Sequence, residues 1–81
     1  MPAFAEFDVV EVVKLLTPDR NYQGTEATKR PPRVGDRGTI VHRLDPTQRD
    51  SPLVVECVDQ AGCTVWLAEF AASELRVLPD Q

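Results

Sequence analysis

The sequence predicts one small all-β domain of five short strands, with a single helical turn before the last strand. Short runs of β-branched and apolar residues alternate with polar ones, and stretches rich in proline and glycine separate these runs. The chain has 81 residues, which is enough for one domain. Because 42% of the residues are hydrophobic, the chain can build a core, and general disorder is excluded.

The first expected strand covers residues 7–16, which are dominated by valine and leucine. The run Val-Val-Glu-Val-Val-Lys-Leu-Leu is also compatible with a helix, because its apolar pairs recur every three residues. We favour the strand, since β-branched side chains lose rotamer freedom in a helix. A long first loop over 17–33 follows, and its prolines and glycine argue against regular structure. Loops longer than about 12 residues are usually functional or mobile.

The rest of the chain predicts a second strand, a polar loop, a hairpin, a helical turn and a short closing strand. We expect the second strand at 39–44, the polar loop at 45–52 and the hairpin at 53–58 and 63–70 around the turn 59–62. The helical turn is expected at 71–75 and the closing strand at 76–78. We expect a single domain over 1–81, with its core in 7–78 and a frayed tail at 79–81. This order of elements matches a five-stranded SH3-like open barrel. An OB-type barrel is the alternative, although it usually has a longer helix before the last strand.

Four segments carry a resemblance to a known family. They are Asp-Val-Val at 8–10, Val-Gly-Asp-Arg-Gly-Thr-Ile-Val at 34–41, Val-Val-Glu-Cys-Val-Asp at 54–59 and Ala-Ser-Glu-Leu-Arg at 72–76. Together they resemble the bacterial domain-of-unknown-function family 4926. The resemblance implies an SH3-like barrel in a small stand-alone protein, without established catalytic residues.

The glycine-rich turn that enters the second strand is also similar to the KOW motif of ribosomal and transcription proteins. The chain departs from the family pattern in its two loops, 17–33 and 45–52, which are longer than usual. Cys57 also stands where the family more often has a larger apolar residue.

The two cysteines, Cys57 and Cys63, flank the expected turn. A turn of four residues pairs Val58 with Cys63 and Cys57 with Thr64. The two sulfur atoms then lie on opposite faces of the hairpin, because side chains alternate along a strand. We therefore expect free thiols, with Cys57 buried on the core face and Cys63 more accessible. Two cysteines without further ligands at suitable spacing do not form a zinc site.

No catalytic residue, metal ligand or cofactor site is expected. A catalytic pair of Cys57 with the single histidine, His42, needs an exposed thiolate, and Cys57 is expected in the core. Asp45 and Asp50 share one loop but match no calcium-loop spacing, so we interpret that loop as solvated.

Five residues are candidates for partner binding: Tyr22, Arg30, Arg33, Arg37 and Trp66. The three arginines and Lys29 form a basic run that would suit an anionic ligand, or they are separate charges on a solvated loop. Tyr22 lies in a polar loop, where a lone aromatic side chain is available for contact. Trp66 is a core residue of the hairpin or lies at the floor of a groove for an extended segment.

The functional surface is expected where the loops 17–33 and 45–52 flank a groove, with Trp66 near its floor. We expect a non-catalytic module that binds a protein partner or self-associates, through these loops or through an open strand edge. The alternative is a KOW-like accessory module that binds RNA or the ribosome. The net charge of −4 argues against nucleic acid. Without a leader or membrane-spanning run, we expect a cytoplasmic protein.

Overall fold

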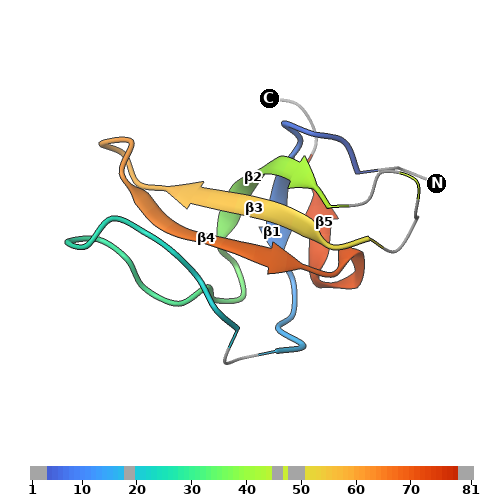
Figure 1. The fold of residues 1–81 in the computed structure, drawn as a ribbon, viewed down its shortest axis with the longest axis horizontal. Coiled ribbons are helices and arrows are strands. Elements are labelled where there is room, and N and C mark those ends of the chain that lie inside the picture. Colours follow the sequence, from blue (N-terminus) through green and yellow to red (C-terminus); the bar gives the residue numbers. More distant parts are fainter. Residues whose placement is uncertain (1–3, 18–19, 45–46, 48–50, 79–81) are drawn as a thin grey trace.

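The computed structural model describes residues 4–17, 20–44, 47 and 51–78. Five antiparallel strands form one open sheet in the order β4-β3-β2-β1-β5 (Figure 1). The fold is all-β, and a single-turn 3₁₀ helix, η1, precedes the last strand, so the predicted SH3-like open barrel is confirmed. The elements are β1 (Val9–Val12), β2 (Arg37–Arg43), β3 (Leu53–Val58), β4 (Thr64–Phe70), η1 (Ala72–Glu74) and β5 (Leu75–Val77).

The core lies between the two halves of this strongly curved sheet. In Figure 1, β1 and β5 cross behind β3 and β4. Alternate side chains of the strands point into the space between them, as the pleat requires. The buried apolar residues are Val10, Val12, Ile40, Leu53, Val55, Cys57, Val65, Trp66, Ala68, Phe70 and Leu75.

β2 begins two residues before the predicted strand. Gly38, near its start, lets β2 approach β3 closely. A Cβ atom at Gly38 would lie 2.7 Å from the carbonyl oxygen of Glu56 and 2.7 Å from a methyl carbon of Val55. Only glycine fits such a close approach between β2 and β3. A bulge between Ile40 and His42 then bends β2 so that it can pair with both halves of the sheet.

β1 is shorter than the predicted strand over 7–16. It ends at Val12 because the next residues turn toward η1: the amides of Val13 and Lys14 both donate to the carbonyl of Glu74. The amide of Leu16 donates to the Glu74 carboxylate, at 2.7 Å. The helix alternative for this segment is not observed.

The β3–β4 hairpin has a different register from the predicted one. Val58 pairs with Thr64 and Cys57 with Trp66, not with Cys63 and Thr64. The turn is one residue longer than expected, because the Asp59 amide donates to the Cys63 carbonyl. A bulge beside Cys57 adds a second extra residue, in β4. Beyond the bulge the shift is two residues, so the side chains from Trp66 onward keep their predicted face, whereas Val65 at the bulge is buried together with Trp66.

Both cysteines are free, Cys57 is buried and Cys63 is partly exposed, as the sequence predicted. The described residues include no helix long and apolar enough to cross a membrane. The predicted tail at 79–81 and most of the predicted loop at 45–52 lie outside the described residues.

Candidate functional site

The long first loop does not extend into solvent but lies along the outer edge of β4. Gln23 and Leu67 exchange two backbone hydrogen bonds of 3.0 and 2.7 Å. The amide of Thr25 donates to the Thr64 carbonyl, and Figure 1 shows the loop running beside β4 over this length. The loop therefore occupies the edge that would otherwise be open to another strand.

Gly24 permits this close contact between the loop and β4. A Cβ atom at Gly24 would lie 2.8 Å from the carbonyl oxygen of Val65 and 2.6 Å from the Cβ of Lys29. Further along the loop, the Arg30 amide donates to the same Val65 carbonyl, at 3.1 Å. The loop thus returns to β4 and is held to it at two points.

The first anchor of the loop is a buried ion pair between Arg20 and Glu74. The Glu74 carboxylate accepts hydrogen bonds from both terminal nitrogens of Arg20 and from the amides of Leu16 and Ala71. Arg20 also lies over the Phe70 ring, with its guanidinium carbon 4.3 Å from the ring centroid. Burial alone would raise the pKa of Glu74, but these donors outweigh it and hold the pKa below its usual range.

The second anchor is the carboxylate of Asp36 at the far end of the loop. It accepts two hydrogen bonds from Arg30, at 2.8 and 2.9 Å, and one from the Trp66 indole, at 2.8 Å. The amide of Arg33 donates to it as well, at 2.9 Å. Burial would raise the pKa of Asp36, but the hydrogen bonds from Arg30, Trp66 and Arg33 keep it lowered.

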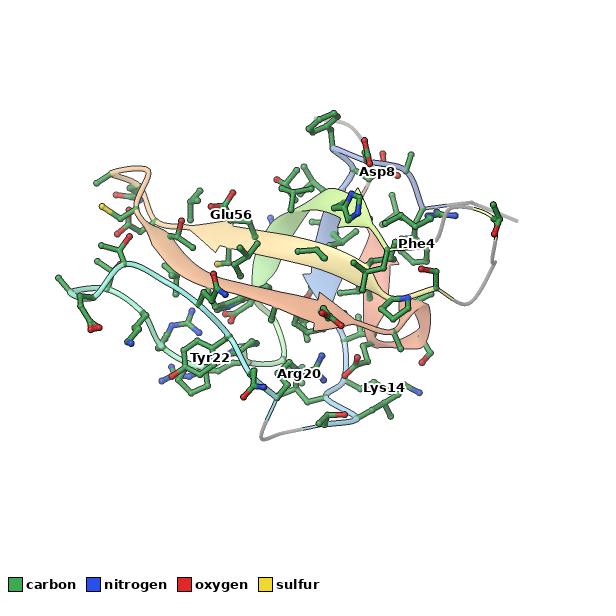
Figure 2. All side chains as sticks on the ribbon, viewed as in Figure 1. Phe4, Asp8, Lys14, Arg20, Tyr22 and Glu56 are labelled. Atoms are coloured by element: carbon green, nitrogen blue, oxygen red, sulfur yellow. The ribbon has the colours of Figure 1, made fainter. Side chains whose placement is uncertain are left out.

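A groove of about 740 Å³ lies between the first part of this anchored loop and the hairpin. Arg20 and Glu74 are among its lining residues, so the ion pair that anchors the loop also forms part of its wall. Figure 2 shows Arg20 and Tyr22 on the same side of the sheet, below β4. Seven of its thirteen lining residues are apolar or aromatic: Leu16, Tyr22, Pro52, Val54, Leu67, Ala68 and Ala71.

The groove has a mixed surface with one free carboxylate. Asn21 and Gln23 line it with amide groups that can donate and accept hydrogen bonds. The exposed side chain of Glu69 also lines it and has no ion-pair or hydrogen-bond partner among the described residues. Leu16 is 57% exposed at the rim. The groove therefore offers apolar contacts, amide groups and one unpaired negative charge.

Among the five predicted partner-binding residues, only Tyr22 lines the groove. Trp66 is 0% exposed and belongs to the core, which is one of its two predicted places, and it does not lie at the floor of the groove. Leu67, Ala68 and Glu69, which follow Trp66 on β4, line the groove in its place.

The predicted basic run is divided by ion pairs. Arg30 is held by Asp36, and Lys29 lies 3.0 Å from Glu26. The exposed side chains of Arg33 and Arg37 form no ion pair or hydrogen bond with the described residues, and neither lines the groove. Because Lys29 and Arg30 are paired with carboxylates, the run does not form one basic patch. Arg33 and Arg37 remain available for contacts away from the groove.

Sequence reasoning missed Arg20, Glu74, Leu16 and Leu67 as site residues. Arg20 and Glu74 are 54 positions apart, and no local pattern connects them. The signal for Leu67 was present, because a leucine facing away from the core of a hairpin strand lies on the outer surface.

The cysteine and histidine considered for catalysis do not form a reactive pair. Burial raises the pKa of the Cys57 thiol, which disfavours the thiolate. His42 is exposed, and its closest charged partner among the described residues is Glu6, at 3.8 Å. The described residues contain no cluster of three or more potential metal ligands. Asp45 and Asp50 lie outside the described residues.

Comparisons of the chain with family models, with curated proteins and with solved structures found no match. The resemblance to the bacterial family 4926 thus stays an expectation that depends on four sequence segments.

Proposed function

We propose that this domain is a non-catalytic interaction module that binds an extended segment of a protein partner in the groove beside β4. The observation that supports the proposal is the anchored loop: Arg20 and Glu74 fix one wall of the groove on the sheet. A wall that is already ordered reduces the entropy lost on binding. The mixed lining of apolar side chains and hydrogen-bonding groups suits an extended peptide segment.

The groove also indicates the chemistry of its partner. Tyr22, Leu67 and Val54 favour apolar side chains of the bound segment. Glu69 is unpaired at the groove, so a lysine or arginine in the segment would meet an opposite charge. The overall net charge of −4 has the same sign and adds to the attraction of a basic segment.

Two observations favour a protein partner over nucleic acid, which a KOW-like module would bind. The ion pairs of Lys29 and Arg30 neutralise half of the basic run. The groove itself carries Glu69 without a neighbouring free arginine or lysine among its lining residues. Titration of a single-stranded RNA at two salt concentrations distinguishes the two functions, because phosphate binding weakens steeply with salt.

Selection from a displayed peptide library, followed by affinity measurements on the selected peptide, tests the proposal. Leu16→Ser removes an exposed apolar side chain from the rim and is expected to weaken binding about tenfold without loss of stability. Val58→Ser is the matched control, because Val58 is exposed on the hairpin but does not line the groove. If no peptide is selected, or if both variants bind equally well, the proposal is wrong.

A further inference from the structure

The outer face of the β3–β4 hairpin continues the groove on the side away from the long loop. Along both strands, buried residues alternate with partly or fully exposed ones beyond the bulge, and the exposed set forms the outer face. The register places Val54 opposite Glu69 and Glu56 opposite Leu67 on this face. Three of them line the groove, and Glu56 adjoins it. We call these four residues, Val54, Glu56, Leu67 and Glu69, the hairpin face.

The hairpin face places two carboxylates on one diagonal and two apolar side chains on the other. Glu69 and Glu56 are diagonal neighbours, and so are Leu67 and Val54. Diagonal residues of an antiparallel pair are about 7 to 8 Å apart. In an extended chain, residues two positions apart are separated by about 6.6 Å and point to the same side. Two alternate side chains of one extended segment can therefore reach both carboxylates at once.

Both carboxylates of the hairpin face lack a counter-charge within the hairpin. The Thr64 hydroxyl donates to Oε2 of Glu56, at 2.7 Å, while Oε1 forms no hydrogen bond or ion pair with the described residues. The side chain of Glu69 is exposed and equally unpaired in the described part of the chain. Neither β3 nor β4 contains a lysine or arginine. On the neighbouring strand β2, His42 already lies 3.8 Å from the carboxylate of Glu6.

We propose that the segment bound in the groove carries two basic residues at alternate positions, one contacting Glu69 and the other Glu56. This inference rests on the proposed function, because the groove holds the segment in place. The aliphatic stems of lysine and arginine pack on apolar surface while their charged ends remain free, so the stems suit Leu67 and Val54. In Figure 2, Tyr22 lies below β4 and Glu56 lies above it on β3, so the segment crosses β4 obliquely. Glu56 is then a specificity-determining residue beyond the groove lining.

The groove beside the loop supplies the remaining part of the pattern. Beyond Glu69, the segment continues toward the loop, where Leu16 and Tyr22 line the groove. An apolar residue two positions from the first basic residue lies on the same side of an extended segment as both basic residues. The expected segment is therefore apolar-x-basic-x-basic, read in one of the two chain directions.

NMR titration of the ¹⁵N-labelled domain with defined peptides tests this spacing. The probes are Leu-Ser-Arg-Ser-Arg and its reversed sequence, and the tighter of the two sets the chain direction. The control has the same composition and charge but adjacent arginines, as in Leu-Ser-Ser-Arg-Arg or its reverse. The alternating peptide is expected to bind about threefold more tightly than the control, because only its second arginine reaches Glu56.

Substitution of Glu56 assigns this difference to one carboxylate. Glu56→Gln should weaken binding of the alternating peptide about threefold and should leave unchanged a peptide whose outer arginine is serine. Glutamine retains an oxygen that accepts from the Thr64 hydroxyl, so the urea midpoint should stay at the wild-type value. Glu26→Gln is the matched control, because Glu26 is 81% exposed, does not line the groove and undergoes the same change of charge.

Four results would each overturn the two-carboxylate pattern. The alternating and adjacent peptides could bind equally well, or neither alternating peptide could bind saturably. Glu56→Gln could bind the alternating peptide as tightly as the wild-type domain, or Glu26→Gln could weaken it to the same extent. These results do not decide the groove itself, because Leu16→Ser changes only its apolar rim. If Leu16→Ser weakens binding of a library-selected peptide while Glu56→Gln has no effect, the groove stands and this inference fails.

Discussion

Replacing Glu74 with glutamine tests whether the long loop is anchored through a buried ion pair. The side chain of Glu74 is 3% exposed and that of Arg20 is 9% exposed. The variant keeps the shape of the side chain but leaves the Arg20 charge without a counter-charge. Its amide nitrogen also faces a donor, from either Leu16 or Ala71, where a carboxylate oxygen accepted before.

The expected cost of this substitution is large for so small a domain. Removing one partner of a buried ion pair costs about 3 kcal/mol. A domain of this length has a free energy of unfolding of roughly 4 to 12 kcal/mol. Urea denaturation followed by the fluorescence of Trp66, the single tryptophan, measures the loss directly.

Combining the substitution with Arg20→Met separates the ion pair from other effects. The double variant no longer carries an unpaired buried charge, so the two substitutions should be non-additive by about 2 kcal/mol. Glu69→Gln is the control on the exposed face and should change stability by less than about 0.5 kcal/mol. A cost below about 1 kcal/mol for Glu74→Gln, with no coupling to Arg20, would refute the anchoring role.

Three further predictions concern titration, the thiols and the sheet. The pKa values of Asp36 and Glu74 are lowered in the folded chain, so both carboxylates stabilise the fold fully above their unfolded-state pKa values of about 4. This stabilisation is lost as the pH falls through the folded-state pKa values, so urea midpoints should be constant from neutral pH to about 5 and fall below it. A thiol reagent should modify Cys63 quickly in the native protein and Cys57 only after unfolding, and two equally fast thiols would contradict the burial of Cys57. Gly38→Ala should lower the free energy of unfolding by about 1 to 3 kcal/mol in thermal melts, because its Cβ would overlap the neighbouring strand; an unchanged melting temperature would exclude that close approach.

The strands and their core face could be predicted because alternation depends only on neighbouring residues. The alternation in 53–58 and 63–70 predicts one face for Leu53, Val55 and Cys57 with Thr64, Trp66 and Ala68, and the structure buries all of these except Thr64, which is half-buried. The pairing itself was wrong by two residues, because an extra turn residue and a bulge leave no clear trace in the sequence. A shift of two residues preserves the face, which is why the core prediction survived the error in register.

The course of the long loop could not be predicted from the sequence. It depends on contacts between distant residues, such as Arg20 with Glu74 and Arg30 with Asp36 beside Trp66. The prolines of the loop indicated irregular structure but not that the loop pairs with β4. For the same reason, the sequence predicted an open strand edge without indicating that the loop covers part of the β4 edge, while β5 is the other edge strand of the sheet.

The most direct test of the proposed groove is an NMR titration of the ¹⁵N-labelled domain with a peptide selected against it. We expect the shifted amide signals to belong to the residues around the groove, which are 16–17, 20–23, 52–54 and 67–71. Signals of Phe7 and Val9, which do not line the groove, should not move with the peptide. Shifts confined to residues outside the groove, or no saturable shifts at all, would contradict the account of the groove as the binding site.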